Sequence, residues 1–181
     1  MLPKTQKIES ARFTFSERFG LDAAAPRQIV FPAVDVAQLM HEDDVAYLDG
    51  ERRLRVATPN FHTLRPRDGS WQRVPNGWLW RVDISCENAL GVNLHFTDMQ
   101  LPEGAELIVY DPSRPGEYTG PFTDDGDFDT GEAWTTCLGS DVARIEYFVP
   151  REVAKRRPRS LPFALADIMH VYRDFFREGE D

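Results

Sequence analysis

Hydrophobic and polar positions alternate over most of the chain with the two-residue period of a β-strand. Between residues 77 and 85 the even-numbered positions are apolar, whereas the odd-numbered ones include an arginine, an aspartate and a serine. Residues 92–96 and 143–147 alternate in the same way, and 107–110 form a short apolar run. Turns rich in Gly, Pro and Asn separate these segments, and Asn76-Gly77 is a hairpin signal. The pattern predicts an all-β fold, an antiparallel sandwich or jelly roll.

The alternating apolar positions also predict the core of this sandwich. One face of each strand carries the large aliphatic and aromatic side chains, and that face must be buried against a second sheet. We therefore expect the following residues in the core: Trp80, Val82, Ile84, Leu94, Phe96, Val109 and Ile145.

One segment in the first half has helical spacing instead. Asp35 is a residue type that caps helix N-termini, and apolar residues follow it at helical spacing as far as the Asp49-Gly50 turn. Near the start, Phe13 and Phe15 alternate with polar neighbours, which predicts a first strand or an extended arm. The pattern of residues 161–176 fits a C-terminal strand and a C-terminal helix equally well.

The change in composition after Pro150 suggests three parts. Residues 151–160 are rich in arginine and contain Pro158, which is typical of an exposed linker. We expect an N-terminal extension at 1–34, the sandwich domain at 35–150, and a basic linker with a C-terminal segment at 151–181.

Charge excludes some partners and singles out one region. The net charge is −9, and residues 97–146 carry twelve acidic against two basic side chains. A general nucleic-acid binder needs a basic surface to displace counterions, so no nucleic-acid partner is expected. A membrane-spanning helix needs about 18 consecutive apolar residues, and the sequence has no such run.

No pattern of an enzyme's catalytic residues is visible. The serine motifs Gly-Asp-Ser-Gly-Gly and Gly-x-Ser-x-Gly are missing, and Ser140 lies where a turn between strands is expected. Cys137 is not tied to a histidine by any motif, so it is a poor candidate for a nucleophile. We therefore expect a chain without catalytic residues.

The acidic loop offers one weak calcium site. Asp125, Asp127 and Asp129 match positions one, three and five of an EF-hand loop. Thr130 replaces the glycine at position six and Thr136 replaces the glutamate at position twelve, so the loop is not an EF-hand. An acidic loop of another kind could still hold calcium, and the alternative is a solvated loop. No other cofactor is expected.

The tryptophans and cysteines each allow two interpretations. The four tryptophans, Trp71, Trp78, Trp80 and Trp134, could form a sugar-stacking platform or belong to the core. Cys86 ends one predicted strand and Cys137 precedes another. A disulfide between them would close a loop of about fifty residues, and two unpaired thiols are the alternative.

A series of short motifs in a fixed order resembles a known family. They are GSW at 69–71, GWLWRVDI at 77–84, ALGVNLHF at 89–96, LPEGAELIVY at 101–110, GPFT at 120–123, WTT at 134–136 and GSD at 139–141. Together with FPAVD at 31–35 and IMHVYR at 168–173, they resemble the N-terminal pro- or accessory domain of secreted bacterial trypsin-like serine endopeptidases of the lysyl-endopeptidase kind.

The resemblance implies a context rather than a catalytic residue. It implies a non-catalytic β-sandwich that assists folding of a trypsin-like serine protease domain, or inhibits it as in a zymogen, in cis or in trans. It also implies a secreted or periplasmic protein. The first residues lack the apolar centre of a signal peptide, so a cytoplasmic location stays open. The alternative function is a free-standing carbohydrate- or protein-binding sandwich.

The same resemblance gives the basic segment a role. Trypsin-like enzymes cut after Lys or Arg because a carboxylate in their specificity pocket pairs with the side-chain cation. We expect processing after Lys155 or Arg156; the alternatives are a basic linker that only balances local acidity, or a family boundary that lies beyond Asp181. Pro158 makes the bond after Arg157 a poor target, because proline on the leaving side fits badly.

Overall fold

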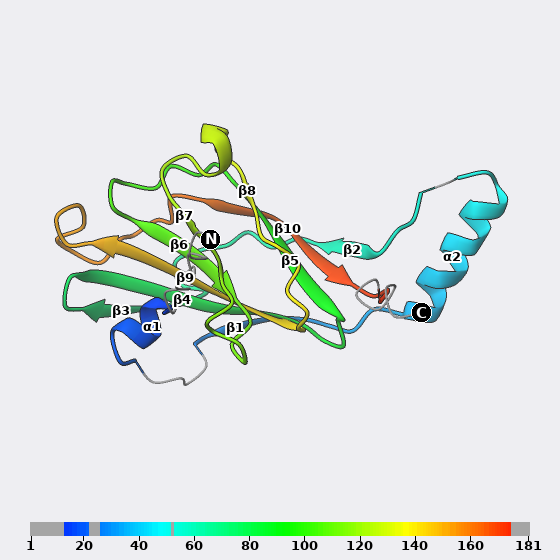
Figure 1. The fold of residues 1–181 in the computed structure, drawn as a ribbon, viewed down its shortest axis with the longest axis horizontal. Coiled ribbons are helices and arrows are strands. Elements are labelled where there is room, and N and C mark those ends of the chain that lie inside the picture. The colour runs from blue at the N-terminus through cyan, green and yellow to red at the C-terminus, as the bar shows by residue number, and fades with distance from the viewer. Residues whose placement is uncertain (1–12, 22–25, 52, 175–181) are drawn as a thin grey trace, which may run out of the picture.

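Ten strands form two sheets in the computed structural model, which describes residues 13–21, 26–51 and 53–174 (Figure 1). The first sheet has the strand order β1 (Gln28–Phe31), β4 (Gly77–Cys86), β9 (Val142–Pro150), β6 (Glu106–Tyr110) and β7 (Thr119–Phe122), and β3 (Ser70–Val74) also pairs with β4. The second sheet has the order β2 (Ala57–Asn60), β10 (Ala164–Val171), β5 (Gly91–Thr97) and β8 (Ala133–Trp134). Among these strands the β1–β4 pairing is parallel and the others are antiparallel.

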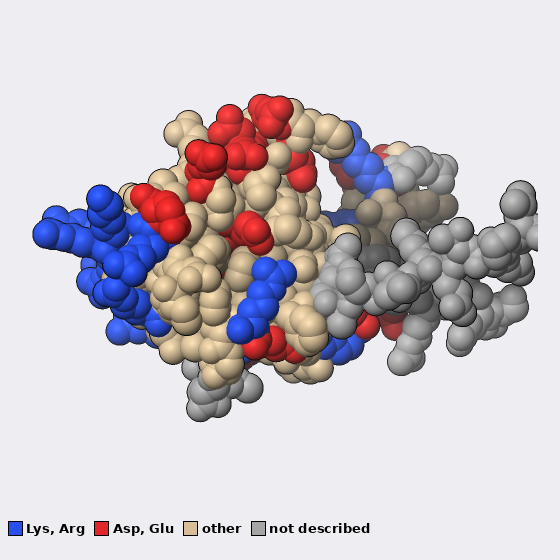
Figure 2. All heavy atoms as spheres, turned by 60° about the vertical axis from the view of Figure 1, so that its left-hand side comes forward, with Lys and Arg blue, Asp and Glu red and all other residues tan. Residues whose placement is uncertain are grey.

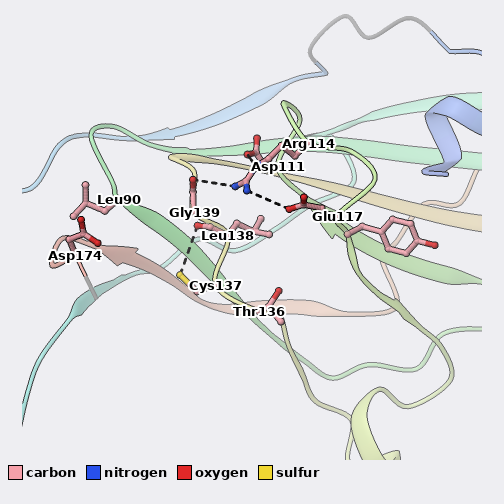
Figure 3. Close-up of a pocket in the computed structure, with 10 residues that line it drawn as sticks. Leu90, Asp111, Arg114, Glu117, Thr136, Cys137, Leu138, Gly139 and Asp174 are labelled. Carbon is pink, nitrogen blue, oxygen red and sulfur yellow. Dashed lines mark hydrogen bonds and ion pairs between the residues drawn. The ribbon is translucent and has the colours of Figure 1, made fainter. Parts of the chain in front are cut away.

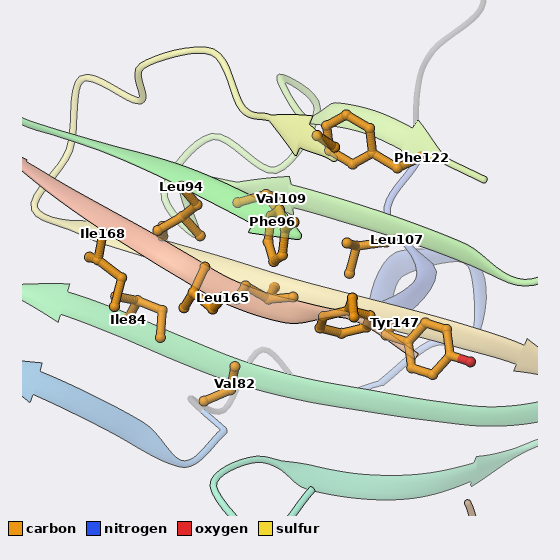
Figure 4. Packing of buried hydrophobic residues seen from close by; sticks show 14 of the residues in the cluster. Val82, Ile84, Leu94, Phe96, Leu107, Val109, Phe122, Tyr147, Leu165 and Ile168 are labelled. Carbon is orange, nitrogen blue, oxygen red and sulfur yellow. The ribbon is translucent and has the colours of Figure 1, made fainter. Parts of the chain in front are cut away.

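The core lies between the two sheets, and its residues are those that the alternation predicts. All seven expected core residues have no exposed surface. Figure 4 shows side chains of β4, β6 and β9 facing those of β5 and β10 across the interior. Truncating any one of the aliphatic residues to alanine would cost about 2–4 kcal/mol, through lost transfer energy and the cavity left behind. The expectation of an all-β sandwich is confirmed.

The hairpin signal at residues 76–77 is also confirmed. Val74 pairs with Gly77, so β3 and β4 are joined by a two-residue turn. Gly77 is required by a close approach of the neighbouring strand, because a Cβ atom there would lie 2.1 Å from the carbonyl oxygen of Val149.

Charged side chains lie buried on the outer face of the first sheet. Arg144 and Asp83 form a bidentate ion pair at 2.7 and 2.9 Å, with both side chains less than a tenth exposed. Beside them, the hydroxyl of Tyr110 donates to the fully buried carboxylate of Glu146 at 2.9 Å. Their cover is the N-terminal segment, whose Ser16 hydrogen-bonds to Glu146 through its amide and hydroxyl groups.

That covering segment is a helix, so the expectation of a strand or arm at Phe13 and Phe15 is wrong. Helix α1 (Phe15–Arg18) is one turn long and begins at Thr14. The Thr14 hydroxyl accepts from the Glu17 amide at 3.2 Å, while the Glu17 carboxylate accepts from the Thr14 amide at 2.8 Å. This reciprocal capping box favours a helical turn, and two aromatic residues in alternation do not outweigh it.

The helix expected after Asp35 is confirmed as α2 (Val36–Leu48), and Asp35 is its N-cap. Figure 1 shows that α2 stands apart from the sandwich, and none of its residues is buried. Polar contacts to Asp43 hold the helix in place: Arg55 donates at 2.8 Å, the Tyr172 hydroxyl at 2.8 Å and Arg173 at 2.9 Å. None of the helices in the described part of the chain is long and apolar enough to cross a membrane.

The two sheets extend beyond the boundaries expected at residues 35 and 150. Strand β1 precedes the first boundary, and β10 follows the second. The C-terminal segment is therefore a strand, and it pairs with both β5 and β2. Residues 151–163 are not a linker between domains. They connect β9 in the first sheet to β10 in the second.

Candidate functional site

Charged side chains are segregated on the surface. Figure 2 shows lysine and arginine side chains gathered at one end of the molecule, and carboxylates gathered on another part of the same view. Three hollows in this region are lined by the following cations, with Glu152 beside them in one hollow: Arg27, Arg65, Arg67, Arg73, Arg151, Lys155, Arg157 and Arg159. We call this region the basic end.

The β9–β10 connection forms much of the basic end. Its first residues are anchored, since Arg151 donates its amide to the Asn76 carbonyl at 2.9 Å and Ala154 to the Pro150 carbonyl at 3.0 Å. Residues 155–161 have no backbone hydrogen bond to any other described residue. The predicted processing residues Lys155 and Arg156 lie here with exposed side chains. The structure thus presents them on an exposed loop anchored at both ends, which we call the basic loop (151–163).

A cavity of about 600 Å³ opens between the basic loop and the start of β3. Its cations are Arg27, Arg67, Arg157 and Arg159, and its other walls come from Pro66, Gly69, Ser70, Trp71 and Pro158. Arg27 donates a guanidinium N–H to the Arg67 carbonyl at 2.6 Å, which joins the chain before β1 to the chain before β3. We call this the basic cavity. Its four arginines are up to 132 positions apart in the chain, so no spacing in the sequence predicts it.

A second cavity, of about 620 Å³, lies near the end of β6 (Figure 3). Arg114 crosses it and is paired on both sides, with Asp111 at 3.1 Å and Glu117 at 3.4 Å. A third bond runs from Arg114 to the Gly139 carbonyl at 3.5 Å. Burial by itself raises the pKa of Asp111, but hydrogen bonds from Ser113 and Arg114 outweigh it and leave the pKa below its usual value. We call this the paired cavity, because its cation is already neutralised.

The cysteines and Ser140 have structural surroundings. Cys86 and Cys137 are both free thiols, so the alternative of two unpaired cysteines is the one observed. Burial raises the pKa of both thiols, that of Cys86 to about 11, and keeps them protonated at neutral pH. Ser140 accepts a hydrogen bond from the Val142 amide at 3.2 Å, as a turn residue does. Neither Cys137 nor Ser140 is bonded to a histidine among the described residues.

Strand β5 places His95 in a cluster that the sequence analysis missed. Its Nδ1 lies 2.8 Å from the carboxylate of Asp167, and its Nε2 lies 3.4 Å from that of Glu132. The ring stacks on the indole of Trp134, with centroids 3.9 Å apart and planes inclined by 9°. These residues are close only because β5 lies between β8 and β10, so no sequence spacing brings them together.

The acidic loop between β7 and β8 contains the calcium candidates Asp125, Asp127 and Asp129. Within the described residues, the structure shows no group of three or more His, Cys, Asp or Glu side chains that could hold a metal ion. Asp127 instead accepts from the Trp134 amide at 3.3 Å. Phe128 projects from this loop with 98% of its surface exposed.

The four tryptophans do not share one surface. Trp80 is fully buried and donates its indole N–H to the Pro66 carbonyl at 2.9 Å. Trp71 and Trp78 are half-buried against the core, whereas Trp134 is 47% exposed. Trp134 is therefore the most exposed of the four, and the expectation of core packing holds for Trp80.

No protein-family model matches this chain, and no solved structure matches its fold.

Proposed function

We propose that this chain is a non-catalytic module that binds a trypsin-like serine protease domain, in cis or in trans, as its inhibitor or folding assistant. The proposal rests on the motif resemblance and on one structural observation, the exposed basic loop. Lys155 and Arg156 lie on backbone that belongs to neither sheet. A protease binds its substrate as an extended segment, so a loop free of strand pairing is the part of this fold that can enter an active site.

The chemistry of the loop suits a trypsin-like specificity pocket. Such a pocket holds a carboxylate that pairs with one lysine or arginine side chain. Both ends of the loop are fixed by long strands, so binding costs less conformational entropy than it does for a free peptide. Pro158 follows Arg157 directly, which leaves Lys155 and Arg156 as the anchors.

The sheet topology changes what cleavage in the loop would do. Strand β10 pairs with β5 at seven positions and with β2 at four. A cut after Lys155 or Arg156 would therefore leave β10 held in the second sheet, with Ile168 in the core. A cut module should stay assembled, as a tightly held inhibitor does, rather than release a pro-segment.

The decisive experiment adds the chain to a trypsin-like protease and follows hydrolysis of a small lysyl substrate. We expect inhibition by the wild-type chain and at least tenfold weaker inhibition by the double variant Lys155→Ala/Arg156→Ala. Arg53→Ala removes an exposed cation outside the basic loop and is the matched control. Full activity of the protease at a large molar excess of the wild-type chain would refute inhibition. The folding role is tested by refolding the denatured protease with and without the chain, and an equal recovery of activity would refute that role.

Size-exclusion chromatography of the cut chain tests the topological argument. Fragments separated by a denaturing gel should elute together under native conditions. Separate elution would show that the loop is a release site.

Trp134 favours a second candidate, the carbohydrate-binding module. Its indole is half-exposed and its orientation is held by the stacked ring of His95, with the carboxylates of Glu132 and Asp167 nearby. Flat aromatic rings beside hydrogen-bonding groups bind sugar rings. Retarded migration in a gel that contains a polysaccharide, lost in Trp134→Ala and kept in Trp78→Ala, would support this candidate over the first.

A further inference from the structure

The basic cavity gathers four guanidinium groups from three separate parts of the chain. Arg27 precedes β1, Arg67 precedes β3, and Arg157 and Arg159 belong to the basic loop. Figure 2 shows how densely cations fill this end of the molecule. Like charges repel, so folding brings these groups together against an electrostatic cost.

No described carboxylate forms an ion pair with these arginines. Among the described residues, none of the four arginines lies within 4.0 Å of an Asp or Glu oxygen. The neighbouring acid, Asp68, is engaged in its own turn, where it accepts from the Arg65 amide at 2.8 Å and lies 3.2 Å from His62. The cavity therefore has guanidinium donors that no described carboxylate uses.

We propose that the basic cavity binds the phosphate or sulfate group of a small ring-shaped molecule. Guanidinium groups present pairs of N–H donors in one plane, and these match two oxygens of a tetrahedral oxyanion. Ser70 adds a hydroxyl group to the same wall. The bond from Arg27 to the Arg67 carbonyl holds one guanidinium in place before any ligand arrives, which reduces the entropy lost on binding.

The size and walls of the cavity indicate more than a bare ion. A volume of about 600 Å³ is in the range of small-molecule sites and exceeds what one phosphate or sulfate ion fills. Trp71 lines it, and its indole is braced edge-on against Tyr147 with centroids 6.0 Å apart. Pro66 and Pro158 add apolar surface. An aromatic and proline-lined wall beside an anion site is suited to a sugar or other ring that carries the anionic group.

The charge distribution argues against an extended polyanion. The whole chain carries a net charge of −9, and Figure 2 shows carboxylates close to the basic end. A nucleic-acid backbone that extended out of the cavity would be repelled by these carboxylates. A single anionic group inside the cavity would not reach them. This inference concerns a site distinct from Lys155 and Arg156, and it does not depend on protease binding.

Isothermal titration calorimetry with four probes tests the inference: glucose 6-phosphate, glucose 6-sulfate, glucose and inorganic phosphate. We expect both esters to bind more tightly than glucose, and to bind more tightly than inorganic phosphate because the ring contributes. Tighter binding of the phosphate ester above its second pKa, about 6, would identify a phosphoryl ligand. Equal binding of the two esters at all pH values would identify a site for either group.

Variants locate the site. The double variant Arg67→Gln/Arg159→Gln should weaken binding at least tenfold, and Arg114→Gln, in the paired cavity, should leave it unchanged. Both changed arginines are exposed, so the double variant should stay folded and should unfold at a midpoint no lower than that of wild type. The inference is overturned if glucose binds as well as its esters, if the double variant binds normally, or if duplex DNA binds more tightly than the esters at 150 mM salt.

Discussion

The two cavities have nearly the same volume, about 620 and 600 Å³, but they treat arginine in opposite ways. In the paired cavity Arg114 has two carboxylate partners and a carbonyl acceptor. In the basic cavity four arginines have no carboxylate partner among the described residues. The number of arginines in a cavity therefore does not by itself indicate an anion-binding site. What matters is whether the protein has already used their donors.

The physical reason is that an ion pair within the protein satisfies the same donors that a ligand would need. A ligand entering the paired cavity would have to displace Asp111, which is only 8% exposed and also accepts from Ser113. A ligand entering the basic cavity would displace only water. The arginine of the paired cavity is therefore held by the protein's own ion pairs, whereas the arginines of the basic cavity keep donors available to a ligand.

The largest expected difference between the cavities comes from a glycine in each wall. A Cβ atom at Gly69 would lie 2.4 Å from the ring of Trp80 and 2.6 Å from the Arg81 carbonyl, whereas at Gly139 the nearest atom is 3.6 Å away on flexible Arg114. Gly69→Ala should destabilise the protein by about 1–3 kcal/mol, because Trp80 is fully buried and cannot yield. Gly139→Ala should change stability by less than about 0.5 kcal/mol. Urea unfolding measures both, and equal effects would contradict the packing described for the basic cavity.

The next largest effect should follow from removing one partner in the paired cavity. Asp111→Ala leaves two Ser113 donors and Arg114 without their acceptor, which should cost about 1–2 kcal/mol. Arg67→Ala, in the basic cavity, removes no ion pair with any described residue and should stay within about 0.5 kcal/mol of wild type. A cost for Arg67→Ala as large as that for Asp111→Ala would mean that the basic cavity is also held by internal pairs.

Lowering the pH should cause a smaller difference in stability between variants of the two cavities. The pKa of Asp111 is lowered in the folded protein, so its contribution is present above the unfolded-state value of about 3.9 and is lost as the pH falls through the folded value. Between pH 7 and pH 3, wild type should therefore lose more stability than Asp111→Asn does. Urea titrations of the two proteins at both pH values measure the difference. An identical loss of stability would show that the ionisation of Asp111 does not contribute to stability. Arg67→Gln is the control, and it should lose as much stability as wild type between the two pH values.

The smallest effect should be a difference of sign at low salt. Arg67→Gln relieves repulsion among like charges and should stabilise the protein by a few tenths of a kcal/mol, whereas Arg114→Gln removes the ion pairs of a half-exposed arginine and should destabilise it by a similar amount. Both changes should shrink at about 0.5 M salt, because screening shortens the reach of exposed charges. Thermal unfolding at two salt concentrations measures these changes in stability. A change of the same sign for both variants would contradict the difference proposed between the two cavities.

Local patterns in the sequence determine the interior and the clearest helix of this protein. Alternation predicts core residues such as Val82 and Leu94, because a strand side chain can face only one of two sides. Asp35 and Gly50 bracket α2, because capping depends on residues close together in the chain. The capping box of Thr14 and Glu17 is equally local, and attention to it would have predicted α1.

Contacts between distant segments are decided only by the tertiary structure. The pattern of β10 fits a helix as well as a strand, and pairing with β5 and β2 selects the strand. Asp83 and Arg144 look like solvent-exposed residues in the sequence, yet both are buried, and their bidentate ion pair offsets the cost of burying two charges. The basic cavity depends on where the connections cross the ends of the sheets. No local propensity determines that placement, since its arginines come from segments that are far apart in the chain.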